Sequence, residues 1–284
     1  MRRNIMALGD RSIRGDYRNV KAAGNLNVED SVIRRLICAG DVNIVKSKIG
    51  NTTCAGHIRA EASEFRYLKA AGAIDFQGVC QGKVILAKGN LSADYLECQI
   101  LRHGFKRKSE KINTNNPSLW SGSYRAEVFE NTAPLSLGFD YEFRNIISSA
   151  PLIGKNEIVC ENFYSFNRIT APEVNAENIF LLVWGEISIK QLAGSRVMIK
   201  NEFLPDKVFR SIEKSQTYRK IKGEKDMVSV ESIEADQIQI ECTKARLVSG
   251  LDVVIGELCI IERVEYRNSI RISEKAVVNE VVKV

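Results

Sequence analysis

The sequence has few aromatic residues, which make up 7% of its 284 positions, whereas 44% of the positions are apolar. That apolar fraction excludes disorder as the main state, and the length allows one long domain or two of ordinary size. Because rings are scarce, the core must be filled by Val, Ile, Leu, Ala and Cys. Such a core favours strands.

Other features are missing as well. The start, MRRNIMALGDRS, lacks the apolar stretch of a signal peptide, and no run approaches the roughly 18 consecutive apolar residues of a membrane span. The seven cysteines form no CxxC pair, which fits a reducing, cytoplasmic setting. A net charge of +6, from 41 Lys and Arg against 35 Asp and Glu, is too mild to require a nucleic-acid partner.

A short repeat fills the first hundred residues, and it is marked by a glycine that follows two small or apolar residues. Its copies are Ala7-Leu8-Gly9, Ala22-Ala23-Gly24, Cys38-Ala39-Gly40, Cys54-Ala55-Gly56, Ala70-Ala71-Gly72, Ala87-Lys88-Gly89 and the degenerate Arg102-His103-Gly104. Their glycines recur at a nearly constant interval of about 16 residues.

Apolar residues keep the same positions in each copy. Four before the glycine stand Ile5, Val20, Leu36, Thr52, Leu68 and Ile85, and two before it stand Ala7, Ala22, Cys38, Cys54, Ala70 and Ala87. Two after it stand Leu26, Val42, Ile58, Ile74 and Leu91, and four after it stand Val28, Ile44, Ala60, Phe76 and Ala93. This alternation indicates strands with one buried face.

A unit of about 16 residues is too short for a strand-helix-strand repeat, which needs about 30. The pattern therefore predicts an all-β fold, a parallel β-solenoid (β-helix) with about 16–17 residues per coil, in which each glycine occupies a corner that needs positive φ or close backbone approach. Two polar stretches interrupt the pattern as insertions.

We divide the chain accordingly. The expected parts are an N-terminal solenoid block (1–104), a polar junction loop (105–123), a second block (124–200), a charged insertion that forms a short helix or is disordered (201–227), and C-terminal coils (228–284).

These features resemble the bactofilins and bactofilin-like polymer-forming cytoskeletal proteins of bacteria, in their long, multi-block variety. The resemblance rests on the glycine-marked ladder, on FNRITAPEVNAENIFLLVWGEISIKQLAGSRVMIK (166–200) and on IEADQIQIECTKARLVSGLDVVIGELCIIERVEY (233–266). It implies a non-enzymatic scaffold that self-associates as a homo-oligomer or filament. Ala-Ala-Gly and Cys-Ala-Gly stand where the family often has Ser-Gly-Ser-Gly, so this ladder is a diverged copy.

Cys38 and Cys54 share one position in adjacent coils, which suggests either packing or half a metal site. Alanines fill that position in other coils, and no third or fourth zinc ligand is placed nearby. We therefore expect structural packing, with no metal and no cofactor.

The only histidines, His57 and His103, lie next to repeat glycines, on the side of the strand that alternation directs outward. Solenoid enzymes are the alternative class, because hexapeptide acyltransferases use a His and polysaccharide lyases use clustered carboxylates. The period here is not six, and Asp41, Asp75 and Asp94 do not share one position. We therefore expect no catalytic residues.

Two basic clusters stand out, and either could contact anionic lipid, nucleic acid or an acidic protein. They are Arg102, Lys106, Arg107, Lys108 and Lys111 in the junction, and Arg210, Lys214, Arg219, Lys220, Lys222 and Lys225 in the insertion. Interspersed Glu110, Glu213, Glu224 and Asp226 favour a solvated loop. Only Phe105 and Tyr218 could stack on bases, so nucleic acid is not expected, while membrane contact through these insertions stays open.

The ends of the solenoid are the places where unpaired strand edges can template another chain. Arg2, Arg3, Arg11 and Arg14 charge the first coil, whereas VVNEVVKV (277–284) is a largely apolar strand. We expect this C-terminal stretch to mediate end-to-end or side-by-side association. The alternative function is a monomeric or dimeric adaptor that binds a protein or envelope component through the solenoid face or the basic insertions.

Overall fold

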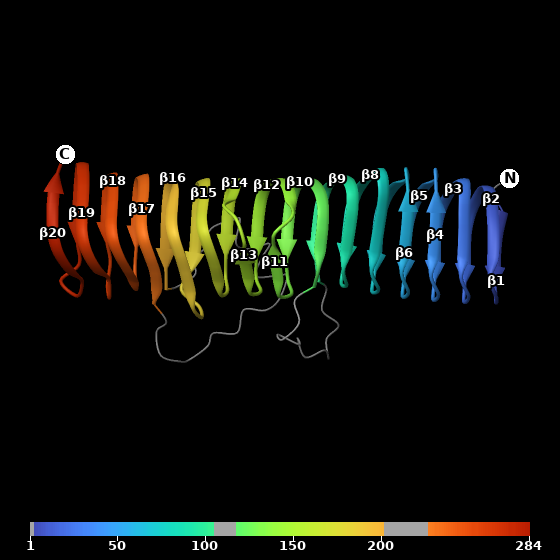
Figure 1. The fold of residues 1–284 in the computed structure, drawn as a ribbon, viewed down its shortest axis with the longest axis horizontal. Helices are drawn as coiled ribbons and strands as arrows, with labels where there is room; N and C mark the ends of the chain where they lie inside the picture. The colour runs from blue at the N-terminus through green and yellow to red at the C-terminus, as the bar shows by residue number, and fades with distance from the viewer. Residues whose placement is uncertain (1–2, 105–117, 202–226) are drawn as a thin grey trace. The chain divides into compact units, whose positions relative to one another are not determined.

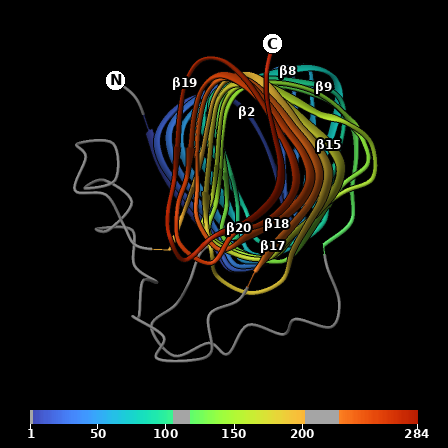
Figure 2. The ribbon, with the colours of Figure 1, turned by 90° about the vertical axis from the view of Figure 1, so that its left-hand side faces the viewer.

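The computed structural model describes residues 3–104, 118–201 and 227–284. These residues form no helix, and parallel strands stacked coil upon coil account for most of them (Figure 1). Figure 2 shows the backbone winding in successive turns. The predicted all-β, parallel β-solenoid is thereby confirmed.

The chain divides into two compact units, Met1–Asn145 and Ile146–Val284. Strands of the first unit are β1 (Arg3–Ala7), β2 (Arg11–Ala22), β3 (Leu26–Cys38), β4 (Val42–Val45), β5 (Lys48–Cys54), β6 (Ile58–Glu61), β7 (Glu64–Ala70), β8 (Ile74–Ala87), β9 (Leu91–His103), β10 (Trp120–Asn131) and β11 (Leu135–Leu137). The division falls within β12 (Asp140–Ser148). Strands of the second unit are β13 (Leu152–Gly154), β14 (Ile158–Ser165), β15 (Ile169–Leu182), β16 (Ile187–Lys200), β17 (Val228–Ile240), β18 (Thr243–Ile255), β19 (Ile260–Ile272) and β20 (Val277–Lys283).

The strand register sets the length of a coil. Cys38 pairs with Ala22 in the coil before and with Cys54 in the coil after, so the two steps are equal in length. In the second unit, Ile158 pairs with Val174 at the same spacing. Other steps differ slightly, since Thr243 follows its partner Val228 by 15 residues and Ile187 follows Ile169 by 18, but inward side chains still return to the same face after each turn.

Two coil steps are much longer than the rest, and they contain the predicted insertions. One leads from His103 to its partner Asn131, and the other leads from Ile187 to its partner Val228. Strand β10 begins at Trp120, inside the range 105–123 that the sequence assigns to a junction loop. The helix or disorder expected between 201 and 227 falls almost wholly outside the described residues.

The core consists of the aliphatic columns that the repeat predicts. Buried members are Val20, Leu36, Leu68 and Ile85, then Cys38, Cys54, Ala70 and Ala87, then Leu26, Val42, Ile58, Ile74 and Leu91, and then Val28, Ile44, Ala60, Phe76 and Ala93. Burying a Val, Leu or Ile side chain contributes roughly 1.5–3 kcal/mol, so each coil adds a thin apolar layer of its own.

The repeat glycines stand at a corner where successive coils approach closely. A Cβ added to Gly40 would lie 2.7 Å from the carbonyl oxygen of Gly24, and one added to Gly56 would lie 2.6 Å from that of Gly40. Neither glycine has a positive φ. Of the two predicted reasons for glycine at this corner, close backbone approach is therefore the one that applies.

A second corner carries positive φ, and it is occupied by residues other than glycine. Asp30, Lys46 and Ala62 have φ of 43°, 46° and 44°, and Gly78, the next member of this series, has 61°. An L-residue rarely adopts this conformation, and a single such residue costs about 1 kcal/mol or more. Contacts around this corner, within and between coils, must offset that cost.

A ladder of buried serines supplies such contacts. The Oγ of Ser47 accepts a hydrogen bond from the backbone N–H of Ser31 (3.0 Å) and donates one to the carbonyl of Val45 (2.7 Å). Ser63 repeats the arrangement with Ser47 and Glu61. Each serine thus joins its own coil to the preceding one while satisfying two buried backbone groups.

Some coils bury a single ring, such as Phe65, Phe76 or Phe163, and the first unit also contains a cluster of rings. Six of them contact one another between the end of the first insertion and the division between the units: Trp120, Tyr124, Phe129, Phe139, Tyr141 and Phe143. The rings of Phe129 and Phe143 stack with centroids 4.6 Å apart. In these coils the ring cluster adds to buried aliphatic residues such as Ala126, Leu135 and Leu137.

Candidate interaction surfaces

The position shared by Cys38 and Cys54, considered above as half a metal site, lies in the packed core. Cys38 and Cys54 are buried, and each thiol donates a hydrogen bond to a backbone carbonyl, that of Gly24 or Gly40, at 3.3 Å. Burial raises the pKa of Cys54 to about 12, which disfavours the thiolate needed for metal binding or nucleophilic attack. All seven cysteines of the sequence are described, and all are free thiols.

His57 belongs to a ladder of polar side chains at the glycine corner. Its side chain is exposed, as predicted, and its Nδ1 accepts a hydrogen bond from the backbone N–H of Ala73 at 3.0 Å. The backbone N–H of His57 in turn donates to Asp41 (2.8 Å), and that of Asp41 donates to Asn25 (3.1 Å). This bonding gives His57 and Asp41 a structural role between coils.

The prediction for His103 is wrong. Its side chain is fully buried, and its Nδ1 lies 2.9 Å from Oδ1 of Asn131. His103 pairs in register with Ala87, which faces inward two residues before its own repeat glycine, Gly89. His103 therefore also faces inward. The prediction failed because it aligned Gly104 with the earlier repeat glycines, which is wrong by one residue. A shift of one residue exchanges the inner and outer faces of a strand.

The three carboxylates considered for catalysis lie at different positions of the coil, as predicted. Asp75 pairs with Arg59 (3.3 Å), whereas Asp94 accepts a hydrogen bond from the backbone of Gly78 (2.7 Å). Bonds from Ser92 and Arg59 lower the pKa of Asp75, although burial opposes them. Among the described residues no three His, Cys, Asp or Glu side chains gather as metal ligands.

Most of the two basic clusters falls outside the described residues. Arg102 is the one described member, and its guanidinium forms an ion pair with Glu130. Lys106, Lys108, Arg210 and the other members, like Phe105 and Tyr218, lie in the undescribed ranges. Within the described residues, no helix has both the length and the apolar character needed to cross a membrane.

A different set of cations lies in register on the first unit, and our sequence analysis missed it. Six residues before each repeat glycine stand Arg18, Arg34, Gly50, Arg66 and Lys83, and strand pairing brings them into one column across β2, β3, β5, β7 and β8. The same spacing that gave the apolar columns would have revealed it. The outward positions do not constrain the fold, because only the buried face must stay apolar from coil to coil.

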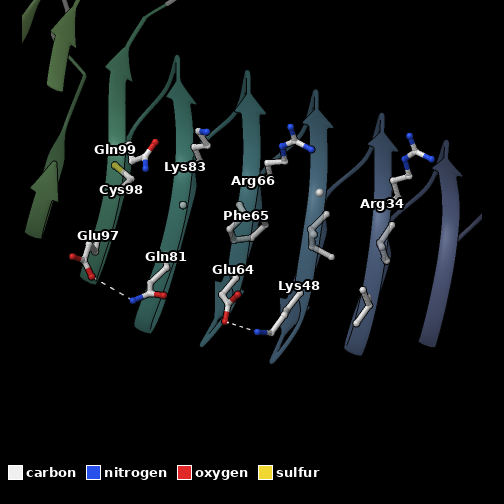
Figure 3. Close-up of a pocket in the computed structure, with 15 residues that line it drawn as sticks. Arg34, Lys48, Glu64, Phe65, Arg66, Gln81, Lys83, Glu97, Cys98 and Gln99 are labelled. Carbon is white, nitrogen blue, oxygen red and sulfur yellow. Dashed lines mark hydrogen bonds and ion pairs between the residues drawn. The ribbon is translucent and has the colours of Figure 1, made fainter. Parts of the chain in front are cut away.

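Part of this column borders a groove of about 750 Å³, which we call the basic groove (Figure 3). Arg34, Arg66 and Lys83 line one rim. In the part of the chain that is described, none of the three has an ion-pair partner, and all three are exposed. A Cβ at Gly50 would collide with the carbonyl oxygen of Arg34, so this rim has a gap between Arg34 and Arg66.

The opposite rim of the basic groove carries two carboxylates, Glu64 and Glu97, each in contact with a neighbouring side chain of the same rim. Lys48 forms an ion pair with Glu64 (2.9 Å), and Gln81 donates a hydrogen bond to Glu97 (3.3 Å). Figure 3 shows this rim and the cationic rim on opposite sides of the hollow. Phe65 lies between them but is only 3% exposed, so this ring is not offered to a ligand, while the charged and hydrogen-bonding groups lie on the two rims.

The C-terminal edge of the second unit exposes side chains that belong to the core ladder. The side chains of Val264 in β19 and Ile255 in β18 are at most 1% exposed. Their register partners one coil later, Val281 and Ile272, are 45% and 40% exposed. Among the described residues the register pairs β20 with β19 alone, which leaves its other edge open.

The first coil is charged but partly self-paired. Arg14 contacts Glu29 (2.8 Å) and Asp30 (3.1 Å) in the next coil, and Arg3 and Arg11 are exposed. Arg2 lies outside the described residues. Met6 and Leu8 of the first coil are 70% and 86% exposed, so this edge carries apolar as well as charged side chains.

Comparisons of the chain with protein-family models, with curated proteins and with solved structures find no match.

Proposed function

We propose that the protein is a non-enzymatic, cytoplasmic structural protein that self-associates or polymerises through its β-solenoid, the bactofilin-like cytoskeletal role that the sequence resemblance implies. The observation that supports this proposal best is the C-terminal edge. There the ladder of core side chains continues into Val281 and Ile272, which remain about half exposed. A coil from a second copy would cover them.

The energy available at this edge is consistent with a weak contact that repeats. Full burial of a Val or Ile side chain contributes roughly 1.5–3 kcal/mol, so covering Val281 and Ile272 would contribute about 1 kcal/mol each. The open backbone edge of β20 adds hydrogen bonds of about 1 kcal/mol each. An open edge of this kind is also how sheets pair with a further chain.

The test is a charge placed at the end of the core. In Val281→Asp a carboxylate replaces an inward side chain of β20, whereas Val277→Asp changes an outward residue of the same strand that is 57% exposed. End-to-end association predicts smaller assemblies by sedimentation velocity for Val281→Asp and no change for Val277→Asp. Equal unfolding midpoints would show that both variants fold.

Deletion of residues 277–284 provides the second measurement. A folded protein whose size distribution is unchanged by the deletion would contradict association through this edge. Loss of assembly in Val277→Asp alone would instead indicate side-by-side contact through the outer face of β20.

The adaptor alternative is favoured by a different observation, the basic groove of the first unit. Its free cations suit an acidic partner, and such binding is compatible with either oligomeric state. We do not propose the enzymatic alternative, because the described carboxylates Asp41, Asp75 and Asp94 occupy separate positions with structural hydrogen bonds.

A further inference from the structure

We propose that the basic groove binds an extended acidic segment of a partner protein, with Asp or Glu at alternate positions along the peptide. The proposal goes beyond self-association, because the groove lies on the side of coils in the first unit and uses no residue of the C-terminal edge. It rests on charge, spacing and the difference between the two rims.

The charge of the cationic rim is uncompensated. Arg34, Arg66 and Lys83 are exposed, and no described carboxylate lies within ion-pair distance of them. By contrast, Lys48 across the groove is held by Glu64 at 2.9 Å. Cations of like sign placed in a row repel one another, and an anionic ligand relieves that repulsion.

The spacing of the cations suits an extended peptide that crosses the strands. Adjacent coils lie about 4.8 Å apart, which puts Arg34 and Arg66 roughly 10 Å apart and Lys83 roughly 5 Å further on. Same-face residues of an extended peptide recur about every 6.7 Å. Long, flexible Arg and Lys side chains accommodate this difference, and an Arg can hold a carboxylate with two parallel hydrogen bonds.

The two rims favour a ligand with one acidic edge. Glu64 and Glu97 on the second rim would repel a ligand that carries negative charge on every side. An extended peptide meets this requirement, because alternate residues point in opposite directions: its acids can face Arg34, Arg66 and Lys83 while neutral residues face Glu64 and Glu97.

A nucleic acid fits the two rims less well than a peptide with one acidic edge. Its phosphates repeat along the whole strand, and its bases need exposed rings on which to stack. The ring in the basic groove, Phe65, is 3% exposed and therefore serves the core.

The gap at Gly50 fits the same ligand. Because a side chain at position 50 would collide with the backbone of β3, the groove stays open between Arg34 and Arg66. A peptide backbone can approach the floor at this point, and the flanking guanidinium groups can reach its carboxylates from either side.

The experiment measures binding of a fluorescein-labelled peptide of about eight residues that alternates Glu and Ser, long enough to span the three cations. Fluorescence anisotropy is recorded at low salt with the full chain. The double variant Arg34→Glu/Arg66→Glu is expected to weaken binding about tenfold or more, since it removes two ion pairs and adds repulsion. Added salt should weaken wild-type binding.

A matched control has the same change in net charge elsewhere. Arg246→Glu/Arg267→Glu alters two exposed arginines of the second unit that have no ion-pair partner among the described residues, and it should leave the affinity within about twofold. The milder Arg66→Gln serves if the first double variant unfolds, and it should weaken binding by a smaller factor.

Three results would overturn the proposal: no binding of the peptide by the wild type, equal losses in the two double variants, or a thymidine oligonucleotide of equal length binding as tightly as the peptide. Sedimentation of the groove variants separates this inference from the proposed function. They should assemble as the wild type does, because they leave the edge at Val281 intact.

Discussion

Gly24, Gly40 and Gly56 lie against one another at one corner of successive coils, where each occupies the space that a neighbour's side chain would need. The requirement is steric, since none of these glycines has a positive φ. It therefore differs from the second corner, where Asp30 and Lys46 adopt positive φ and retain their side chains. The two corners should respond to substitution in different ways.

Gly56→Ala should destabilise the first unit by about 1–3 kcal/mol, the usual cost of forcing a methyl group into a packed site. Its Cβ would lie 2.6 Å from the carbonyl oxygen of Gly40. Gly9→Ala is the control, because no atom lies within 4 Å of the Cβ it would add. Urea unfolding followed by circular dichroism measures both, and equal midpoints for the two variants would contradict the steric account.

Burial of His103 should make the stability of the folded protein depend on pH, and the sign of that dependence follows from its pKa. Burial lowers its pKa below the value of about 6.5 expected in the unfolded chain, although the bond to Asn131 opposes this. The folded state therefore binds fewer protons, and its stability is complete above about pH 6.5. Stability is lost as the pH falls further, by up to about 1.4 kcal/mol per unit.

We expect the free energy of unfolding to fall between about pH 6.5 and 5 by more in the wild type than in His103→Gln. His57→Asn is the control: His57 is exposed, and asparagine holds the same corner position at Asn25. Urea titrations over this pH range provide the measurement. A wild-type pH dependence that survives unchanged in His103→Gln would contradict the assignment.

At the scale of the strands, alternation predicted most of the fold. Columns such as Leu36, Thr52 and Leu68 are buried as expected, because a face that is apolar in every coil leaves one possible register. The failure at His103 has the same origin. The marker triplet had degenerated there, and a polar side chain in an inward position gives no sign of its burial.

Hydrogen bonds between coils could not be predicted in this way. Ser31, Ser47 and Ser63 look like ordinary polar residues of a turn, and their burial follows from a positive-φ corner that the sequence marks with Asp, Lys and Ala. The basic groove was missed for another reason. Its column was present at a constant spacing, but which outward residues border a hollow depends on the bends of each coil.

The serine ladder predicts that removing a single serine hydroxyl lowers the free energy of unfolding. Ser47→Ala removes an acceptor for the backbone N–H of Ser31 and a donor to Val45, leaving two buried groups unsatisfied. We expect a loss of about 1–3 kcal/mol in urea unfolding, whereas Thr53→Ala, at an exposed position of β5, should change stability by less than about 0.5 kcal/mol. A negligible effect of Ser47→Ala would show that the ladder does not stabilise the corner.

At the scale of the whole molecule, each coil contacts mainly the coils beside it, so stability is nearly a sum of neighbouring interfaces. The same arrangement creates an edge wherever a coil lacks a neighbour. In the second unit that edge displays Val281 and Ile272, side chains of the type that every interior coil buries. The proposed self-association repeats between copies the contact that stacks coils within one chain.

Sedimentation velocity of the full chain over a range of protein concentration tests this central claim most directly. The account predicts that larger species grow with concentration and persist at high salt, because the edge contact is apolar and hydrogen-bonded and is therefore weakly screened. A single species of monomer mass, unchanged in sedimentation coefficient across the whole concentration range at both low and high salt, would contradict it.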